Sequence, residues 1–155
     1  SGTSFNKLLL EVASDVNPKN SVIPVLGMRV AFLQDYRVQM VALEMVIKQC
    51  MSLPCHFIMT GHVDREKDET TGGYVNGPLL TGKHTQEIPL LFDEVYVAMN
   101  KQTSKGQEYY LLTQNEGAYK ARSRIAGEKP LERHEPQNIK ALLKKCDFPY
   151  EDKQI

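Results

Sequence analysis

The residue best placed for chemistry is His62, which follows Gly61 at the end of a short, mostly apolar run over 55–60. The run predicts a buried β-strand, because it comes directly after a predicted helix and is mostly apolar. In open α/β sheets, ligands collect at the carboxyl ends of strands. His62 is therefore a candidate to contact a ligand or an attacking water, and a purely structural histidine is the alternative.

A glycine-rich string, GPLLTGKH over 77–84, is the nearest approach in this sequence to the phosphate loop GxxxxGK[ST]. Its two glycines and Lys83 have the offsets of that loop. However, His84 replaces the Ser or Thr that would hold Mg²⁺, and the string does not follow a predicted strand. We therefore interpret it as a flexible loop without a phosphate site.

Zinc ligand types occur close together at Cys50, Cys55, His56 and His62. The spacing C-x4-C-H-x5-H lacks the second paired motif of a structural zinc site. Cys55 and His56 are neighbours on the predicted strand and would point to opposite faces. We expect free thiols and no metal site. The odd count of three Cys is typical of reduced thiols in a cytoplasm-like compartment.

Two helices and the run over 55–60 form the predicted first part of the chain. Apolar residues three and four apart predict a helix near the start, with Thr3 or Ser4 as N-cap, and a second helix over 34–51 that ends before Pro54. Residues 14–27 predict a loop. In the second helix Gln39 is expected to face water. The expected apolar faces are Phe5, Leu8, Leu9 and Val12, then Val38, Val41, Met45 and Ile47.

A long loop is predicted over 64–83, since its glycines and mixed charges show little periodicity. We expect this loop to be mobile without a ligand. Its alternating charges over 64–69 are expected to be a solvated face, and a functional role is the alternative. A short helix is predicted over 84–91, limited to its first turn or broken by Pro89.

Antiparallel strands dominate the predicted second part. Residues 94–99 and 108–113 predict a β-hairpin with a turn over 101–106, and 119–125 predict a third strand. A final helix is expected to start with Pro136 at its first position. The third strand places three cations on one face, where they either line a solvated sheet edge or contact phosphate: Lys120, Arg122 and Arg124.

Composition excludes several classes of protein. The 155 residues are typical of one domain, with 41% hydrophobic residues and 19 Lys+Arg balanced by 19 Asp+Glu. These values exclude a collagenous chain, a charged disordered tail and a polybasic nucleic-acid tail. No apolar run approaches the roughly 20 residues of a membrane span, and no signal peptide is visible. Since the first residue is Ser1, we expect a processed product, an excised domain or a part of a longer protein.

A family resemblance rests on the strings TGHVDREKD over 60–68 and IPLLFDEVY over 88–96. Together they resemble the C-terminal half of phage-encoded RecA-like P-loop ATPases, a group associated with recombination and single-strand annealing. Shorter strings fit the same pattern, and the resemblance covers roughly 34–146. The opening residues SGT are similar to those that follow the Walker B Asp. Walker A and that Asp are both missing from this chain.

The resemblance implies an α/β fold, in which a RecA-like sheet portion with helices carries an antiparallel β-hairpin extension. Residues 1–155 would be a single domain, the C-terminal part of the ATPase core. The parent protein would bind ATP and Mg²⁺ and hydrolyse ATP, whereas this chain by itself would be inactive and would not bind ATP tightly. His62 would be the polar sensor that reads the γ-phosphate.

The resemblance also implies partners. The loop over 64–83 would bind DNA, single-stranded rather than duplex, and the protein would form homo-oligomers in the host cytoplasm. Cations on the later strands and turn would reach a neighbouring subunit's nucleotide, where a cation stabilises charge on the transferred phosphoryl group. These cations are Lys105, Arg122 and Arg124. The DNA-binding residues would be Arg65, Lys67, Gly72, Gly73, Asn76 and Lys83.

Two other functions stay open. The first is a non-catalytic structural or interaction protein that reuses the α/β scaffold without a phosphate loop. The second is a DNA-binding module that needs no nucleotide, whose log affinity would fall with log salt in the absence of ATP. A GxxxxGK[ST] motif encoded upstream of Ser1 would favour the ATPase.

Overall fold

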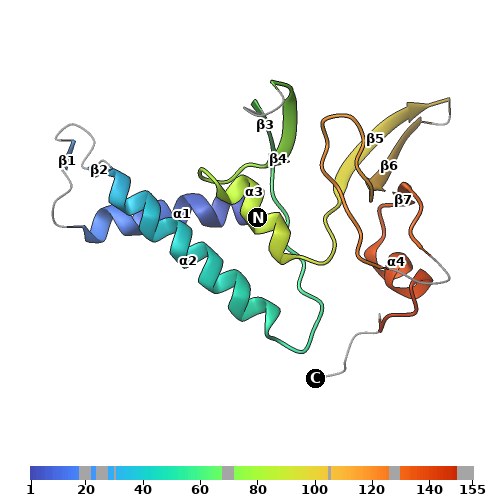
Figure 1. The fold of residues 1–155 in the computed structure, drawn as a ribbon, viewed down its shortest axis with the longest axis horizontal. Coiled ribbons are helices and arrows are strands. Elements are labelled where there is room, and N and C mark those ends of the chain that lie inside the picture. The colour runs from blue at the N-terminus through green and yellow to red at the C-terminus, as the bar shows by residue number, and fades with distance from the viewer. Residues whose placement is uncertain are drawn as a thin grey trace. The chain divides into compact units, whose positions relative to one another are not determined.

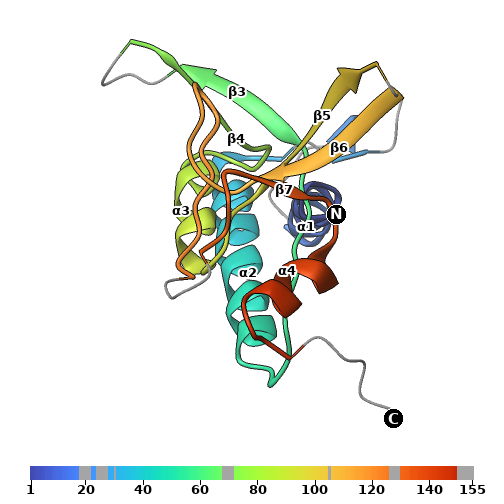
Figure 2. The ribbon, with the colours of Figure 1, turned by 90° about the vertical axis from the view of Figure 1, so that its right-hand side faces the viewer.

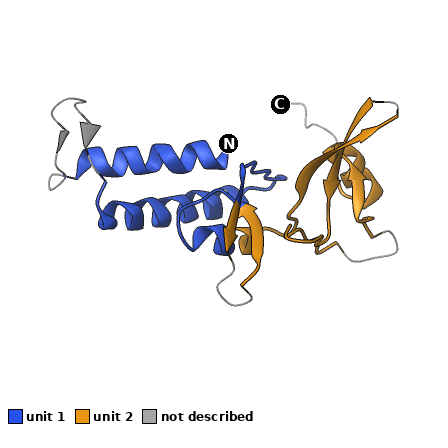
Figure 3. Ribbon diagram, turned by 90° about the horizontal axis from the view of Figure 1, so that it is seen from above, with its two compact units in different colours: residues 1–64, 78–88 blue, residues 65–77, 89–155 orange. Residues whose placement is uncertain are grey.

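The computed structural model describes residues 1–17, 31–67, 72–104, 106–125 and 130–149, together with the backbone at 22–23 and 28–29. The fold is mixed α/β, which confirms the predicted class at that level. The chain forms two compact units (Figure 3). Unit 1 comprises residues 1–64 with 78–88, and unit 2 comprises residues 65–77 with 89–155.

Two long helices form the frame of unit 1. Helices α1 (Gly2–Val16) and α2 (Leu33–Met51) lie side by side and run in opposite directions (Figure 1). Helix α2 begins one residue before its predicted start and ends at Met51, as predicted, with Ser52 as its C-cap. Between the helices, β1 (Val22–Ile23) pairs antiparallel with β2 (Met28–Arg29).

The start of α1 differs from the prediction. Ser1 is the N-cap, since its hydroxyl accepts a hydrogen bond from the Ser4 N–H at 3.4 Å, and the predicted caps Thr3 and Ser4 lie inside the helix. The helix also continues to Val16, so the loop predicted over 14–27 is wrong for its first three residues. Residues 18–21 and 24–27 of that loop lie outside the described residues.

The buried faces of the helices differ from the predicted ones, except at Ile47, which is 2% exposed and was predicted to be on the apolar face of α2. The expected apolar residues Leu8 and Val12 of α1 are about half exposed, as are Val38, Val41 and Met45 of α2. Gln39, expected to face water, is 1% exposed. Polar side chains occupy much of the buried face because they find hydrogen-bond partners there. The buried residues are Gly2, Thr3, Asn6, Ala13 and Ser14 of α1, and Asp35, Gln39, Leu43 and Ile47 of α2.

The buried carboxylate of Asp35 joins the two helices at one end. Its Oδ2 accepts a hydrogen bond from the Phe32 N–H at 2.7 Å, and its Oδ1 accepts one from Asn17 Nδ2 at 2.6 Å. Phe32 precedes α2 and Asn17 follows α1. A single acidic residue therefore caps the start of α2 and holds the end of α1 beside it.

The strand predicted over 55–60 is wrong. Residues 56–62 carry no assigned strand, and the side chains over 55–60 are exposed apart from half-buried Phe57 and Met59. The composition of the run favours a strand, but a strand needs a neighbour with which to exchange backbone hydrogen bonds. In the described part of the chain, this segment has no such ladder.

The long loop predicted over 64–83 is also wrong in part. Strands β3 (Val63–Lys67) and β4 (Tyr74–Pro78) form a two-stranded sheet, and residues 68–71 lie outside the described residues. Helix α3 (His84–Leu91) follows and continues for two residues beyond Pro89. The predicted helix is confirmed, although Pro89 neither confines it to one turn nor breaks it.

Unit 2 contains the predicted hairpin, with longer strands. Strands β5 (Val97–Thr103) and β6 (Gly106–Leu112) pair antiparallel, and β7 (His134–Pro136) pairs with the other edge of β6 (Figure 2). The turn predicted over 101–106 is therefore shorter than expected. Helix α4 (Ile139–Lys145) packs on this sheet through a cluster of Leu111, Leu131 and Leu142.

Two further predictions in unit 2 need correction. Residues 119–125 form isolated bridges, Tyr119 with Asn76 and Arg122 with Val95, where a continuous strand was predicted. Pro136 ends β7, and α4 instead starts after Asn138, whose side chain accepts a hydrogen bond from the Ala141 N–H at 3.1 Å. A helix that starts after Asn138 is more stable than one that starts at Pro136, because the Asn138 side-chain oxygen accepts from an N–H group that the helix would leave unpaired.

The buried face of α2 leads to a stability prediction. Leu43→Ala should lower the free energy of unfolding by about 2–5 kcal/mol, because it removes a fully buried side chain. Val41→Ala, on the exposed face, should change it by less than about 0.5 kcal/mol. Urea denaturation of the two variants measures both values, and the reverse order would contradict this assignment of faces.

Candidate functional site

His62 lies beside the N-terminal end of α1. The Gly2 N–H donates to the Thr60 carbonyl at 2.6 Å, and the His62 N–H donates to Thr3 Oγ1 at 3.1 Å. His62 is exposed, and among the described residues no hydrogen bond is found for its imidazole. The predicted ligand-contacting histidine is thus placed at a helix N-terminus, where the N–H groups of Gly2, Ser4 and Phe5 already donate to the Thr60 carbonyl, Ser1 Oγ and the Ser1 carbonyl.

Gly2 makes this close approach possible. A Cβ at position 2 would contact the Met59 side chain and would lie 3.2 Å from the Thr60 carbonyl oxygen. Any larger residue would push the start of α1 away from the segment that ends in His62. The position therefore depends on the absence of a side chain.

The first two turns of α1 also hold the segment that leaves the β3–β4 hairpin. Asn6 Nδ2 donates to Thr81 Oγ1 at 3.1 Å, and Gln39 Nε2 donates to the Asn6 carbonyl at 2.6 Å. The Leu79 N–H donates to the His62 carbonyl at 2.7 Å. These bonds connect α1, α2 and both ends of the hairpin through a buried polar interior.

The string over 77–84 does not form a phosphate cradle. It does follow a strand, β4, and precede a helix, α3, contrary to the sequence interpretation. However, the N–H groups of His84 and Thr85 donate to the carbonyls of Thr81 and Gly82, both at 3.3 Å. They are therefore turned into the helix start and away from any anion. His84, in the place of the Mg²⁺-binding hydroxyl, is 3% exposed.

Most of the predicted DNA-binding residues lie on the β3–β4 hairpin. Arg65 and Lys67 belong to β3, and the Arg65 guanidinium lies over the Tyr74 ring, 4.1 Å from its centroid. Gly72 has φ +71°, which favours glycine, and precedes β4 together with Gly73. The Asn76 N–H donates to the Ala118 carbonyl at 2.8 Å. Lys83 lies apart from this hairpin, directly before α3 in unit 1.

The predicted cations in unit 2 are held at the end of α3. Arg122 is half-buried and its Nη2 donates to the carbonyls of Pro89 at 2.8 Å and Phe92 at 2.9 Å. Arg124 is exposed and pairs with Asp93 at 3.1 Å. The Pro89 carbonyl also accepts from the Phe92 N–H at 3.3 Å. A cation at the last carbonyls of a helix stabilises the helix end. The solvated cationic row is therefore wrong for Arg122, and Lys105 lies outside the described residues.

Glu94 fixes the backbone next to these arginines. Its Oε1 accepts from the N–H groups of Arg124 at 2.8 Å and Ile125 at 3.1 Å, and its Oε2 accepts from the Tyr96 hydroxyl at 2.8 Å. Burial, together with the hydrogen bond to the Glu94 carboxylate, raises the pKa of Tyr96 well above its ordinary value of 10.0. Glu94 is thus a structural clamp.

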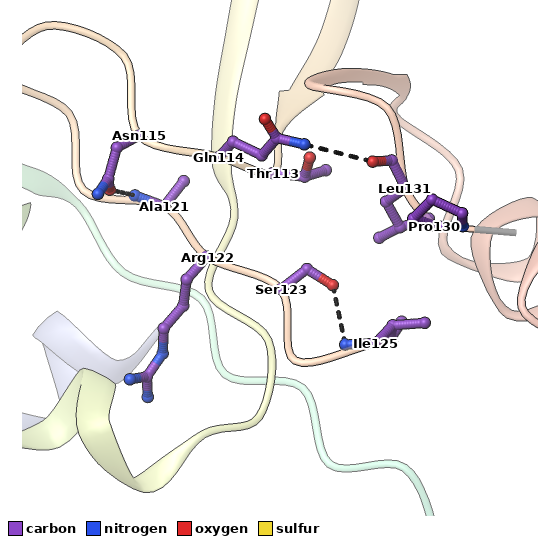
Figure 4. Close-up of a pocket in the computed structure, with 9 residues that line it drawn as sticks. All are labelled: Thr113, Gln114, Asn115, Ala121, Arg122, Ser123, Ile125, Pro130 and Leu131. Carbon is purple, nitrogen blue, oxygen red and sulfur yellow. Dashed lines mark hydrogen bonds between the residues drawn. The ribbon is translucent and has the colours of Figure 1, made fainter. Parts of the chain in front are cut away.

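A cavity of about 280 Å³ lies in unit 2 (Figure 4). Its polar side chains mostly bond within its own wall: Gln114 Nε2 donates to the Leu131 carbonyl at 3.4 Å, and Asn115 Oδ1 accepts from the Ala121 N–H at 3.0 Å. Arg122 also lines the cavity, and in Figure 4 its side chain points away from the other labelled side chains. This arrangement offers no nucleophile with a neighbouring base.

The last features of the described residues concern metal binding and membrane crossing. Within the described ranges, no group of three or more His, Cys, Asp or Glu side chains is arranged to hold a metal ion. None of the described helices has the length and apolar character needed to cross a membrane. Comparison of the chain with protein-family models, with curated proteins and with solved structures finds no match.

The structure brings the predicted site residues into two sets. His62 and Lys83 belong to unit 1, whereas Arg122, Arg124 and the hairpin residues belong to unit 2. Sequence reasoning missed three residues that position these sets: Asn6, Tyr74 and Glu94. Tyr74 had a signal, since it is an aromatic residue directly after two glycines and near two cations. A polar residue on a helix, such as Asn6, carries no comparable signal.

The contacts of Arg122 predict a stability effect. Arg122→Ala should lower the free energy of unfolding by about 1.5–3 kcal/mol, because two hydrogen bonds from a charged donor are lost. Arg124→Ala removes an exposed ion pair and should change it by less than about 1 kcal/mol. Denaturant unfolding of both variants measures the difference, and equal effects would contradict the capping role of Arg122.

The raised pKa of Tyr96 predicts a pH effect. The folded state favours the neutral phenol, so its contribution to stability is complete below pH about 10, where an unfolded tyrosine titrates, and is lost as the pH rises further. In an ultraviolet tyrosinate titration, Tyr96 should therefore ionise at a pH well above the ordinary tyrosine value of 10.0. Tyr96→Phe should remove that step, and an unchanged titration curve would contradict the assignment.

Proposed function

We propose that this chain is part of a RecA-like, DNA-associated ATPase core that acts in phage DNA recombination or replication. The nucleotide site would be completed by a phosphate loop and a Walker B strand that this sequence does not contain. The chain would contribute His62, close to the γ-phosphate, and a DNA-binding hairpin. The resemblance of the strings over 60–68 and 88–96 is one support, and the second is the surface of unit 1.

The observation that carries this proposal is a second apolar face on each long helix. Each helix buries one face in the helix pair, and on another face it exposes large apolar side chains over about half of their surface or more. Soluble monomers rarely expose extended apolar patches, so such faces mark a missing layer. The exposed residues are Leu8, Val12 and Val16 of α1, and Val38, Val41 and Met45 of α2.

A β-sheet is the layer that fits. The segment over 56–62 is strand-like in composition, exposes Ile58, and lies against the start of α1 through the bond from the Gly2 N–H to the Thr60 carbonyl. In α/β folds, helices cover the faces of a mostly parallel sheet whose strands come from other parts of the chain. Strands placed beside 56–62 would complete a ladder and bring the covering helices onto a sheet.

The described residues do not by themselves form a site for ATP or Mg²⁺. The string over 77–84 directs its N–H groups into the start of α3 and buries His84. We therefore assign phosphate binding to the absent phosphate loop, and to this chain only the wall formed by His62 and the start of α1. Arg124 is the cation best suited to reach a neighbouring subunit, because it is exposed, whereas Arg122 is occupied at α3. Homo-oligomers in the host cytoplasm, bound to single-stranded DNA, follow from the same resemblance.

The first test compares the same substitution in the 155-residue chain and in a longer protein. Val41→Lys should change the stability of the 155-residue chain by less than about 0.5 kcal/mol, because the side chain is exposed. In a longer protein that includes the upstream reading frame, it should cost more than about 2 kcal/mol, because the lysine would be buried against the sheet. Gln49→Lys, at an exposed site, should be neutral in both. An equally neutral Val41→Lys in the longer protein would contradict the missing layer.

The upstream reading frame supplies the second test. It should encode a GxxxxGK[ST] motif within about one domain length, roughly 100–150 residues. In that longer protein His62→Ala should lower the ATPase kcat by about 100-fold, with the ATP Kd little changed. His56→Ala, on the same segment, is the control. An unchanged kcat would remove His62 from the mechanism.

A non-catalytic interaction protein is the second candidate. It is favoured for this chain taken by itself, because the string over 77–84 does not fit a phosphate and the apolar faces are suited to a protein partner. An upstream reading frame without a phosphate loop would support this candidate and contradict the ATPase.

A further inference from the structure

We infer that one face of the β3–β4 hairpin, formed by Arg65, Lys67 and Tyr74, binds single-stranded nucleic acid by stacking a base on Tyr74. The inference rests on the proposed function only for the choice of DNA as the nucleic acid. It adds the surface, the manner of binding and a residue that the sequence interpretation did not include.

The pleat of β3 sorts its charges onto two faces. Successive side chains of a strand point to opposite sides. Arg65 and Lys67 therefore share one face, and Asp64 and Glu66 share the other. A run that is electrically balanced in the sequence becomes a cationic face and an acidic face in the structure.

Tyr74 belongs to the cationic face. Its ring lies under the Arg65 guanidinium, 4.1 Å from centroid to cation. Tyr74 is nevertheless 53% exposed. The cation–π contact holds the ring in place and covers one face of it with the guanidinium, so a base would stack on the part of the ring that stays exposed. An aromatic surface beside cations is the combination by which proteins bind single strands, with bases on the ring and phosphates at the cations.

Gly72, which precedes β4, has φ +71°, and a Cβ added there would meet no atom of the described residues within 4 Å. A duplex is a poor fit, since its bases are stacked on one another and their faces are not available to Tyr74.

The test is binding of the 155-residue chain to a fluorescein-labelled oligothymidine of about 15 nucleotides, without ATP, across about 50–200 mM salt. Tyr74→Leu should weaken binding about 10- to 100-fold with the salt slope unchanged, whereas Tyr74→Phe should retain affinity within a few-fold. Tyr109→Leu is the matched control, since Tyr109 is 58% exposed on a different hairpin. It should bind as the unaltered chain does.

The charges give a second readout. Arg65→Gln and Lys67→Gln should each reduce the slope of log affinity against log salt by up to about 0.7, the value for one phosphate contact with a single strand. Asp64→Asn, on the opposite face, should not weaken binding. The chain has no Trp, so its tyrosine fluorescence should be quenched by the oligonucleotide, and Tyr74→Phe should remove much of that quenching.

Three results would overturn the inference: no binding at low salt, equal affinity for duplex and single strand, or unchanged binding by Tyr74→Leu. Tyr74→Phe keeps the ring. If this variant still binds the oligonucleotide while its fluorescence quenching is reduced, then weaker binding by Tyr74→Leu is not caused by a disrupted hairpin. Failure of the ATPase proposal is a separate result. It is measured by the upstream motif and by Val41→Lys, and neither affects binding of DNA by this hairpin.

Discussion

The structure of unit 1 depends on a short chain of buried hydrogen bonds, from Gln39 Nε2 to the Asn6 carbonyl and from Asn6 Nδ2 to Thr81 Oγ1. Apolar packing is tolerant of sliding, whereas these bonds form in only one register of α1 against α2. The interior nevertheless keeps polar atoms that have no partner among the described residues: Asn6 Oδ1, Gln39 Oε1 and His84 Nδ1. Each such atom costs about 1–3 kcal/mol if it stays unpaired. A polar interior of this kind is less forgiving than an apolar one, and it specifies where the start of α1 lies.

Unit 2 uses the same principle with charged groups. Glu94 gathers two backbone N–H groups and a tyrosine hydroxyl, while Arg122 gathers two carbonyls at the end of α3. A second buried carboxylate, Glu135, accepts from Lys145 Nζ at 2.6 Å and from the Glu132 N–H at 2.7 Å. Segments without regular secondary structure, such as 119–125, are thus positioned by side chains that replace the missing ladder. In this way the unit orders its irregular backbone around a small sheet and one short helix.

Local signals in the sequence predicted the elements that local physics determines. The β5–β6 hairpin and the bounds of α2 follow from alternation, a glycine turn and a terminating proline, and all lie close in sequence. The buried face of α2 could not be predicted, because Asp35 and Gln39 are buried only through partners on α1 and beside it. The run over 55–60 has the composition of a strand, but pairing is a property of two segments. The guanidinium of Arg122 does bind oxygen atoms, but the sequence could not distinguish the oxygen atoms of a phosphate from the carbonyl oxygen atoms of a helix.

The first two turns of α1 hold both ends of the β3–β4 hairpin. Three bonds act there in parallel, Gly2 to Thr60, Thr3 to His62 and Asn6 to Thr81, and a fourth, from Leu79 to His62, joins the two ends of the hairpin to each other. A pull on either strand of the hairpin is therefore shared among bonds that must break together, which is the arrangement of a mechanical clamp.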